Sequence, residues 1–212
     1  SSEDTTKDTA EFDWKINVQR LRIENLNFVM LGTKPQDLPI AALNINPSPS
    51  LTTQNLKISS LSLETRVQFD KNAVQLWIDH LGFNSNFGFD LKGLSGDFYI
   101  SKSRAEINKL NIETNRSWVQ MDYVFIDKLD LMKVEGLPSF KGKDMRLSIV
   151  SRKFDFDDLK GFLPELDFLD GNLVFEMKAK GKFDDIIIEK CSIVTPNTNM
   201  GFSGRMVNLI DP

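Results

Sequence analysis

Apolar and polar residues alternate along most of the chain. The alternation is clear in residues 14–18, 87–91, 121–125 and 173–177. Because successive side chains of a β-strand point to opposite faces, a period of two indicates strands with one dry face and one solvated face. The pattern predicts an all-β fold: an elongated, curved antiparallel β-sheet, shaped like a groove or a taco, with at least half of the residues in strands.

A six-residue pattern, Ile-x-x-Leu-x-(Leu/Ile/Phe), recurs along the chain. Its copies begin at Ile23, Ile58, Ile78, Ile107, Ile126 and Ile188, the last with Cys191 in place of Leu. A step of three residues moves a side chain to the other face of a strand unless an extra residue is absorbed, so each copy must contain a bulge or a tight bend. The unequal spacing of the copies favours a meander of hairpins built from irregular repeats over a strict tandem array.

Two stretches interrupt the alternation. Residues 31–55 hold four of the eight prolines and predict an irregular excursion between strands. Residues 156–163 have apolar positions at the spacing of one short helix, with Asp157 or Asp158 in the first turn, where carboxylates cap free amides. Asp155 completes an acidic cluster that lacks the glycine and the terminal Glu of a calcium loop, so capping is preferred. The domain is expected to span 13–212, with 1–12 disordered or extraneous to it.

Composition and charge remove several classes of function. The 26 Lys and Arg residues against 30 Asp and Glu give a net charge of −4, and no basic patch with interleaved aromatic residues predicts a nucleic-acid partner. Cys191 is the only cysteine, which excludes an intrachain disulfide and a Cys-based zinc site. His80, the only histidine, takes the polar third position of its repeat and is interpreted as a bend residue. We therefore expect no catalytic residue, no metal and no cofactor, and a protein that is not an enzyme.

The chain is rich in phenylalanine, with 16 Phe against two Tyr. Such residues serve either as a closed core or as the wall of an open groove, where each buried CH₂ of an acyl chain gains ~0.8 kcal/mol. Alternation does not choose between a closed core and an open groove. It does predict which residues share one apolar face. They are Leu61, Leu63, Phe69, Leu76, Phe87, Phe89, Leu91, Leu110, Ile112, Tyr123, Phe125, Phe175 and Met177.

The order of features in residues 154–212 resembles the repeat units of AsmA-like and TamB-like envelope proteins, the bridge-like lipid transfer type. Phe154, Phe156 and Leu159 lead into a short helix, the stretch 169–175 and the turn 180–185 follow, and Gly201 and Gly204 come near the end. The similarity extends over residues 56–212 and is weak before them. It implies a periplasmic rod, open along one side, in the cell envelope of a Gram-negative bacterium. It further implies a lipid partner, a part in outer-membrane biogenesis, and inner-membrane attachment through a segment absent from this chain.

Two other functions remain open at this point. The chain would act in outer-membrane protein assembly if an open sheet edge bound a strand of a nascent β-barrel protein by β-augmentation. It would be a secreted interaction module if its strands formed a β-sandwich. A groove needs an uncovered dry face, whereas augmentation needs a free edge.

Overall fold

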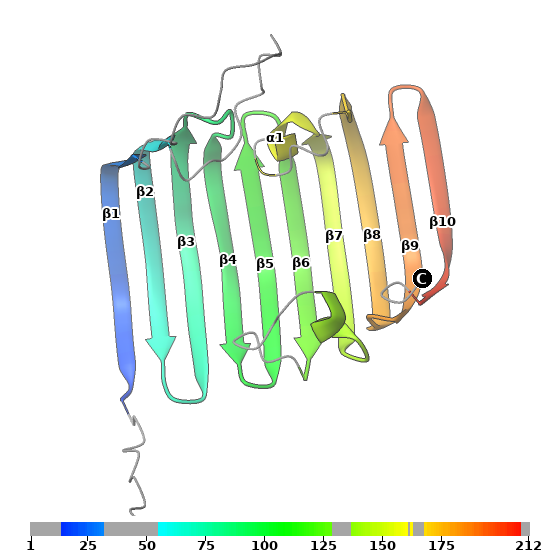
Figure 1. The fold of residues 1–212 in the computed structure, drawn as a ribbon, viewed down its shortest axis with the longest axis horizontal. Helices are drawn as coiled ribbons and strands as arrows, with labels where there is room; N and C mark the ends of the chain where they lie inside the picture. Colours follow the sequence, from blue (N-terminus) through cyan, green and yellow to red (C-terminus); the bar gives the residue numbers. More distant parts are fainter. Residues whose placement is uncertain (1–13, 32–54, 129–136, 161, 163–167, 209–212) are drawn as a thin grey trace, which may run out of the picture.

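A computed structural model describes residues 14–31, 55–128, 137–160, 162 and 168–208 (Figure 1). The predicted segment 1–12 and nearly all of the proline-rich stretch 31–55 lie outside these residues.

Ten strands form one open antiparallel sheet in which every strand pairs only with its neighbours in sequence. The strands hold more than half of the 212 residues, which confirms the predicted all-β, open, antiparallel fold. Figure 1 shows them side by side from β1 to β10. They are β1 (Ile16–Leu31), β2 (Asn55–Phe69), β3 (Ala73–Ser85), β4 (Leu91–Ser101), β5 (Arg104–Thr114), β6 (Trp118–Asp127), β7 (Asp144–Asp155), β8 (Asn172–Lys182), β9 (Asp185–Thr195) and β10 (Thr198–Val207).

Bulges lie near the middle of many strands, where the repeated pattern predicts them. The residues Asn25, Ser60 and Lys109, each third in its copy, have positive φ, and the pairing register shifts beside each of them. In β3 and β9 the register shifts within the copies that contain His80 and Lys190. The extra residue restores the phase, so the Ile and the Leu of a copy share a face. The predicted bulges are confirmed in these five copies.

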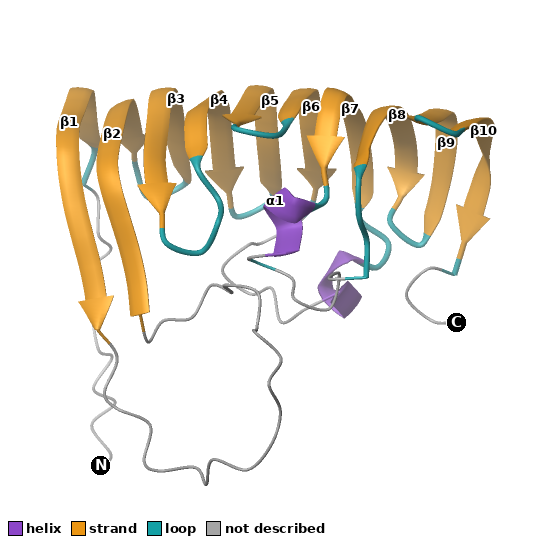
Figure 2. Cartoon of the chain, turned by 90° about the horizontal axis from the view of Figure 1, so that it is seen from above, coloured by secondary structure: helices purple, strands orange, loops and turns teal. Residues whose placement is uncertain are grey.

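The bulges also account for the curvature of the sheet. A bulge bends its strand and increases the local twist, so bulges at similar heights in neighbouring strands bend the sheet along a line that crosses them. Figure 2 shows the strands arching over at mid-length, with α1 (Asp157–Lys160) and the 3₁₀ helix η2 (Leu137–Phe140) below the arch. We call the side below the arch the inner face and the opposite side the outer face.

The short helix α1 forms within the predicted range 156–163, but capping differs from the prediction. Asp157 and Asp158 do lie in its first turn. The amide of Asp157, however, donates to the Asp155 carboxylate at 3.0 Å. Asp158 is buried and accepts hydrogen bonds from side chains of the β5–β6 turn instead.

Candidate functional site, the inner face of the arch

The inner face carries apolar side chains from all ten strands. Residues directly opposite each other in antiparallel strands place their side chains on the same face, so the pairing can be followed from strand to strand. One such row consists of Val18, Val67, Leu76, Phe98, Ile107, Val124, Leu147, Ala179, Ile188 and Gly204. A parallel row consists of Ile23, Leu63, Leu81, Leu94, Ile112, Val119, Ser151, Phe175, Ile193 and Met200.

Most side chains of these rows stay in partial contact with solvent. Phe98, Ile107 and Val124 are only half-buried although they lie on the central strands. On the two outermost strands exposure is higher, at 47% for Leu26 and 46% for Phe202. A sheet normally buries its apolar face against a second layer, and among the described residues no second layer of secondary structure covers this one.

The rim of the arch beside α1 carries a cluster of aromatic rings. Phe87 and Phe89, in the β3–β4 connection, pack edge-on against Phe162 with ring centroids 5.4 and 4.8 Å away. The predicted strand at 87–91 is therefore wrong: Gly88 has a positive φ and β4 begins only at Leu91. The two rings still lie beside the inner face, because Phe89 also contacts Phe83 of β3 at 6.1 Å.

A buried carboxylate fastens α1 to this rim. Asp158 accepts a hydrogen bond from the Thr114 hydroxyl at 2.5 Å and pairs with Nε of Arg116 at 3.0 Å. Arg116 also donates to the carbonyl oxygen of Gly88 at 2.6 Å, so three connections are tied together. On the exposed side of α1, hydrogen bonds from Lys160 to Asp157 and Asp170 raise the pKa of the lysine and lower that of Asp157.

At the opposite rim, η2 closes an apolar pocket over the inner face. The pocket has a volume of about 270 Å³. Phe140 of η2 forms one wall and contacts Phe183 at a centroid distance of 5.2 Å. The rest of the lining consists of Phe98, Ile100, Ala105, Glu106, Ile107, Val124 and Ile126.

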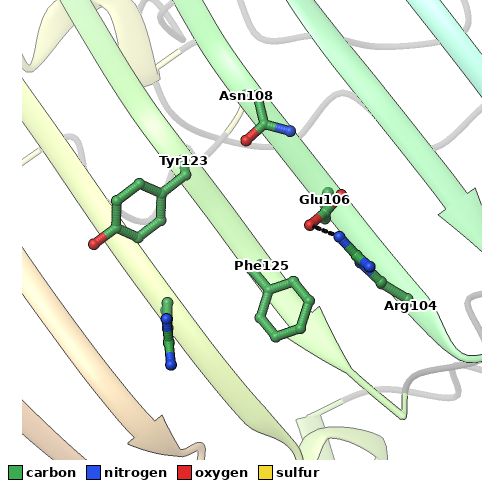
Figure 3. Close-up of a pocket in the computed structure, with 6 residues that line it drawn as sticks. Arg104, Glu106, Asn108, Tyr123 and Phe125 are labelled. Carbon is green, nitrogen blue, oxygen red and sulfur yellow. Dashed lines mark hydrogen bonds and ion pairs between the residues drawn. The ribbon is translucent and has the colours of Figure 1, made fainter.

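Tyr123 and Phe125 lie on the outer face, which corrects their nomination for the apolar one. Tyr123 pairs with Ser148, and Phe125 pairs with Glu106 and Arg146. Figure 3 shows both rings beside Arg104, Glu106 and Asn108. These five residues and Arg146 line an open depression of about 580 Å³. The guanidinium of Arg104 lies 5.2 Å from the ring of Phe125, a cation–π contact that gives this aromatic residue a partner on a polar surface.

Nine of the thirteen nominated residues lie on the inner face within strands, and Phe87 and Phe89 lie at its rim. The nine are Leu61, Leu63, Phe69, Leu76, Leu91, Leu110, Ile112, Phe175 and Met177. Sequence reasoning missed Val124 and the neighbouring Phe98 and Ile107. A signal existed for Val124: Ile126 begins a repeat copy, and a residue two positions before it shares its face.

The single histidine lies away from the inner face. His80 is exposed on the outer face, where its Nε2 lies 3.1 Å from the Ser62 hydroxyl. Within the described part of the chain, no three His, Cys, Asp or Glu side chains are grouped to hold a metal. None of its helices is long and apolar enough to cross a bilayer.

Comparison of the chain with protein-family models, curated proteins and solved structures finds no match.

Proposed function

We propose that this chain is a segment of an AsmA/TamB-like envelope protein that shields or conducts lipid acyl chains along its inner face between the two membranes. The proposal is supported by one observation above all: the apolar face crosses ten strands without interruption and, among the described residues, has no second layer. The resemblance in residues 154–212 points in the same direction.

An acyl chain supplies the missing layer. Each CH₂ removed from water gains ~0.8 kcal/mol, and the gain needs no directional partner. Because apolar side chains follow one another from β1 to β10, a chain can shift along the face and exchange one set of contacts for a similar set. Such a surface holds lipid without a fixed polar site, which suits transport better than storage.

The free sheet edges favour a second candidate function. Neither the outer edge of β1 nor that of β10 pairs with another described strand. An edge of this kind can add a strand by β-augmentation, as assembly of an outer-membrane β-barrel protein would require. The described strands form one sheet and not the two packed sheets of a sandwich, so no similar support exists for the secreted sandwich module.

The first test is extraction of the purified chain followed by lipid mass spectrometry, with Phe98→Asp as the test variant. Phe98 lies in the middle of an inner-face row, so a charge there should reduce the retained lipid several-fold. Because the ring is only half-buried, the variant should still fold, with an unchanged β-type circular dichroism spectrum.

Tyr99→Asp is the matched control, since it places the same charge on the next residue of the same strand but on the outer face. It should retain lipid like the unmodified chain. A folded Phe98→Asp variant that keeps its lipid would contradict the groove. Selective unfolding of Phe98→Asp would indicate a closed core, in which an unpaired charge costs several kcal/mol.

A further inference from the structure

We propose that the pocket under η2 and the lysines of the adjoining rim form a seat for an anionic membrane lipid, with an acyl chain in the pocket and the head group on the rim. This inference rests on the proposed function and makes it more specific. It assigns the lipid a preferred binding position and an orientation, whereas the proposed function alone requires only uniform contact along the inner face.

The pocket is suited to the end of one acyl chain. Its volume of about 270 Å³ corresponds to roughly nine water molecules at ~30 Å³ each. Seven of its eight lining residues are apolar, so water inside would find few hydrogen-bond partners. Phe140 gives it a wall that the open part of the inner face lacks.

The two rims of the arch differ in charge. Among the described residues of the connections, the rim beside η2 has Lys71, Lys102, Lys128, Lys141 and Lys143 against Asp70 and Asp184. The rim beside α1 has Asp90, Asp157, Asp158 and Asp170 against Arg116 and Lys160. An anionic head group is therefore attracted to the first rim and repelled by the second.

The lysines adjoin the pocket. Lys102 follows the lining residue Ile100 by two positions, and Lys128 follows Ile126 by two. The amide of Lys128 donates to the carbonyl oxygen of Ser103 at 2.6 Å, which joins the two connections. The amide of Lys143 donates to the carbonyl oxygen of Phe140 at 3.0 Å, so this lysine is held next to the pocket wall.

Two of these lysines are available to a ligand. Lys128 lies 3.8 Å from a carboxylate oxygen of Asp144. Lys102 and Lys143 lie on either side of Lys128 along this rim. No described carboxylate forms an ion pair with either of them. A phosphate placed between them would supply the missing negative charge.

The test is calorimetric titration of the delipidated chain with dioctanoyl-phosphatidylglycerol and, separately, with dioctanoyl-phosphatidylcholine, both as monomers. The unmodified chain should bind the anionic lipid more tightly. Lys102→Gln with Lys143→Gln should weaken the binding of that lipid by about 25-fold, at about fivefold for each lysine near an anionic group. It should leave the zwitterionic lipid nearly unchanged. Lys92→Gln, at the other end of β4, is the control and should change neither.

Ala105→Phe tests the pocket itself, because the added ring would fill it from the floor. Ala105→Phe should weaken the binding of both lipids. Thr198→Phe adds the same ring to the inner face of β10 and should leave the binding of both unchanged. Should Ala105→Phe fail to fold, a lipid with a diazirine at the chain end, photolysed on the unmodified protein, should label residues of the pocket.

The outcomes separate this inference from the proposed function. Labels spread evenly over β1–β10, or equal affinity for the two lipids, would overturn the seat and leave the groove intact. No binding of either lipid would overturn both.

Discussion

At the scale of the residue, the recurring Ile-x-x-Leu step depends on backbone geometry as much as on hydrophobicity. Asn25, Ser60 and Lys109 adopt φ between 52° and 54°. Asn tolerates this left-handed region, whereas Lys has no such preference, and an L-residue there costs roughly 1–2 kcal/mol. The cost is offset by the apolar contacts that the bulge keeps on the inner face.

Lys109 allows this strain to be measured. Lys109→Gly should change the free energy of unfolding by less than ~0.5 kcal/mol, because relief of strain is offset by the greater freedom of glycine in the unfolded chain. Lys109→Val should lower it by ~1–2 kcal/mol, because a β-branched residue fits positive φ poorly. Urea denaturation of both variants checks the order.

Lys180 is the matched control. It is an exposed lysine of β8, a strand that is paired on both sides, and it pairs in regular register. There the order should reverse, with Val more stable than Gly, because extended backbone favours β-branched residues. The same order at both positions would contradict a strained bulge at Lys109.

Sequence reasoning at this scale succeeds where polar residues mark the phase of a strand. Leu61 and Leu63 stand among serines, so alternation assigns them to the inner face correctly. The run Tyr123, Val124, Phe125 and Ile126 is apolar at every position, and alternation alone does not choose between its two phases. Long aromatic side chains beside Arg104 are accommodated on the outer face, a contact between strands that no local pattern encodes.

At the scale of the element, α1 is too short to be stable alone, and its position depends on side chains of the sheet. Asp158, which binds Thr114 and Arg116 of the β5–β6 turn, supplies the attachment, and Phe162 adds ring contacts with Phe87 and Phe89. The apolar spacing of 156–163 identified the helix. It could not identify the partner of Asp158, because Thr114 lies 44 residues away in sequence.

Removal of this carboxylate should release the helix from the rim. Asp158→Ala should lower the free energy of unfolding by ~1–2 kcal/mol, since it removes the closer of the two acceptors of the Thr114 hydroxyl and leaves Arg116 without its charge partner. Amide hydrogen exchange in 156–160 should accelerate. The loss of stability stays small because the side chain of Arg116 is 36% exposed and regains solvation.

Asp170→Ala is the control for charge removal near the same helix. Asp170 pairs with Lys160 through a side chain that is 85% exposed, so its loss should cost less than ~0.5 kcal/mol. Equal effects of the two substitutions would show that Asp158 is not the attachment.

At the scale of the whole molecule, the fold is quasi-one-dimensional, because each described strand pairs only with its neighbours in sequence. The resulting arch can be extended by further strands at either edge without rearrangement. Alternation and the repeats were sufficient to predict this open meander. They could not decide between an open groove and a closed core, since that depends on what lies against the inner face.

The number of strands has a consequence for the two free edges. With ten antiparallel strands, β1 and β10 run in opposite directions, so the β10 edge of one copy can pair with the β1 edge of another and continue the same antiparallel sheet. Such a contact is heterologous and does not close. The apolar inner-face residues Met200, Phe202 and Met206 of β10 are 40–46% exposed, and all residues of this strand are exposed.

We therefore expect the isolated chain to associate through these edges as its concentration rises, and Phe202→Lys to suppress the association. A charge that points inward from an edge strand is a common protection against edge pairing, because an added strand would bury it. Val174→Lys is the control. The Val174 side chain is 44% exposed, close to the 46% of Phe202, but it belongs to β8, a strand that is paired on both sides. Sedimentation velocity over a range of concentrations should show larger species for the unmodified chain and for Val174→Lys, and a single small species for Phe202→Lys. Association that persists in Phe202→Lys would show that the β10 edge does not mediate it, and would weaken β-augmentation as a function of that edge.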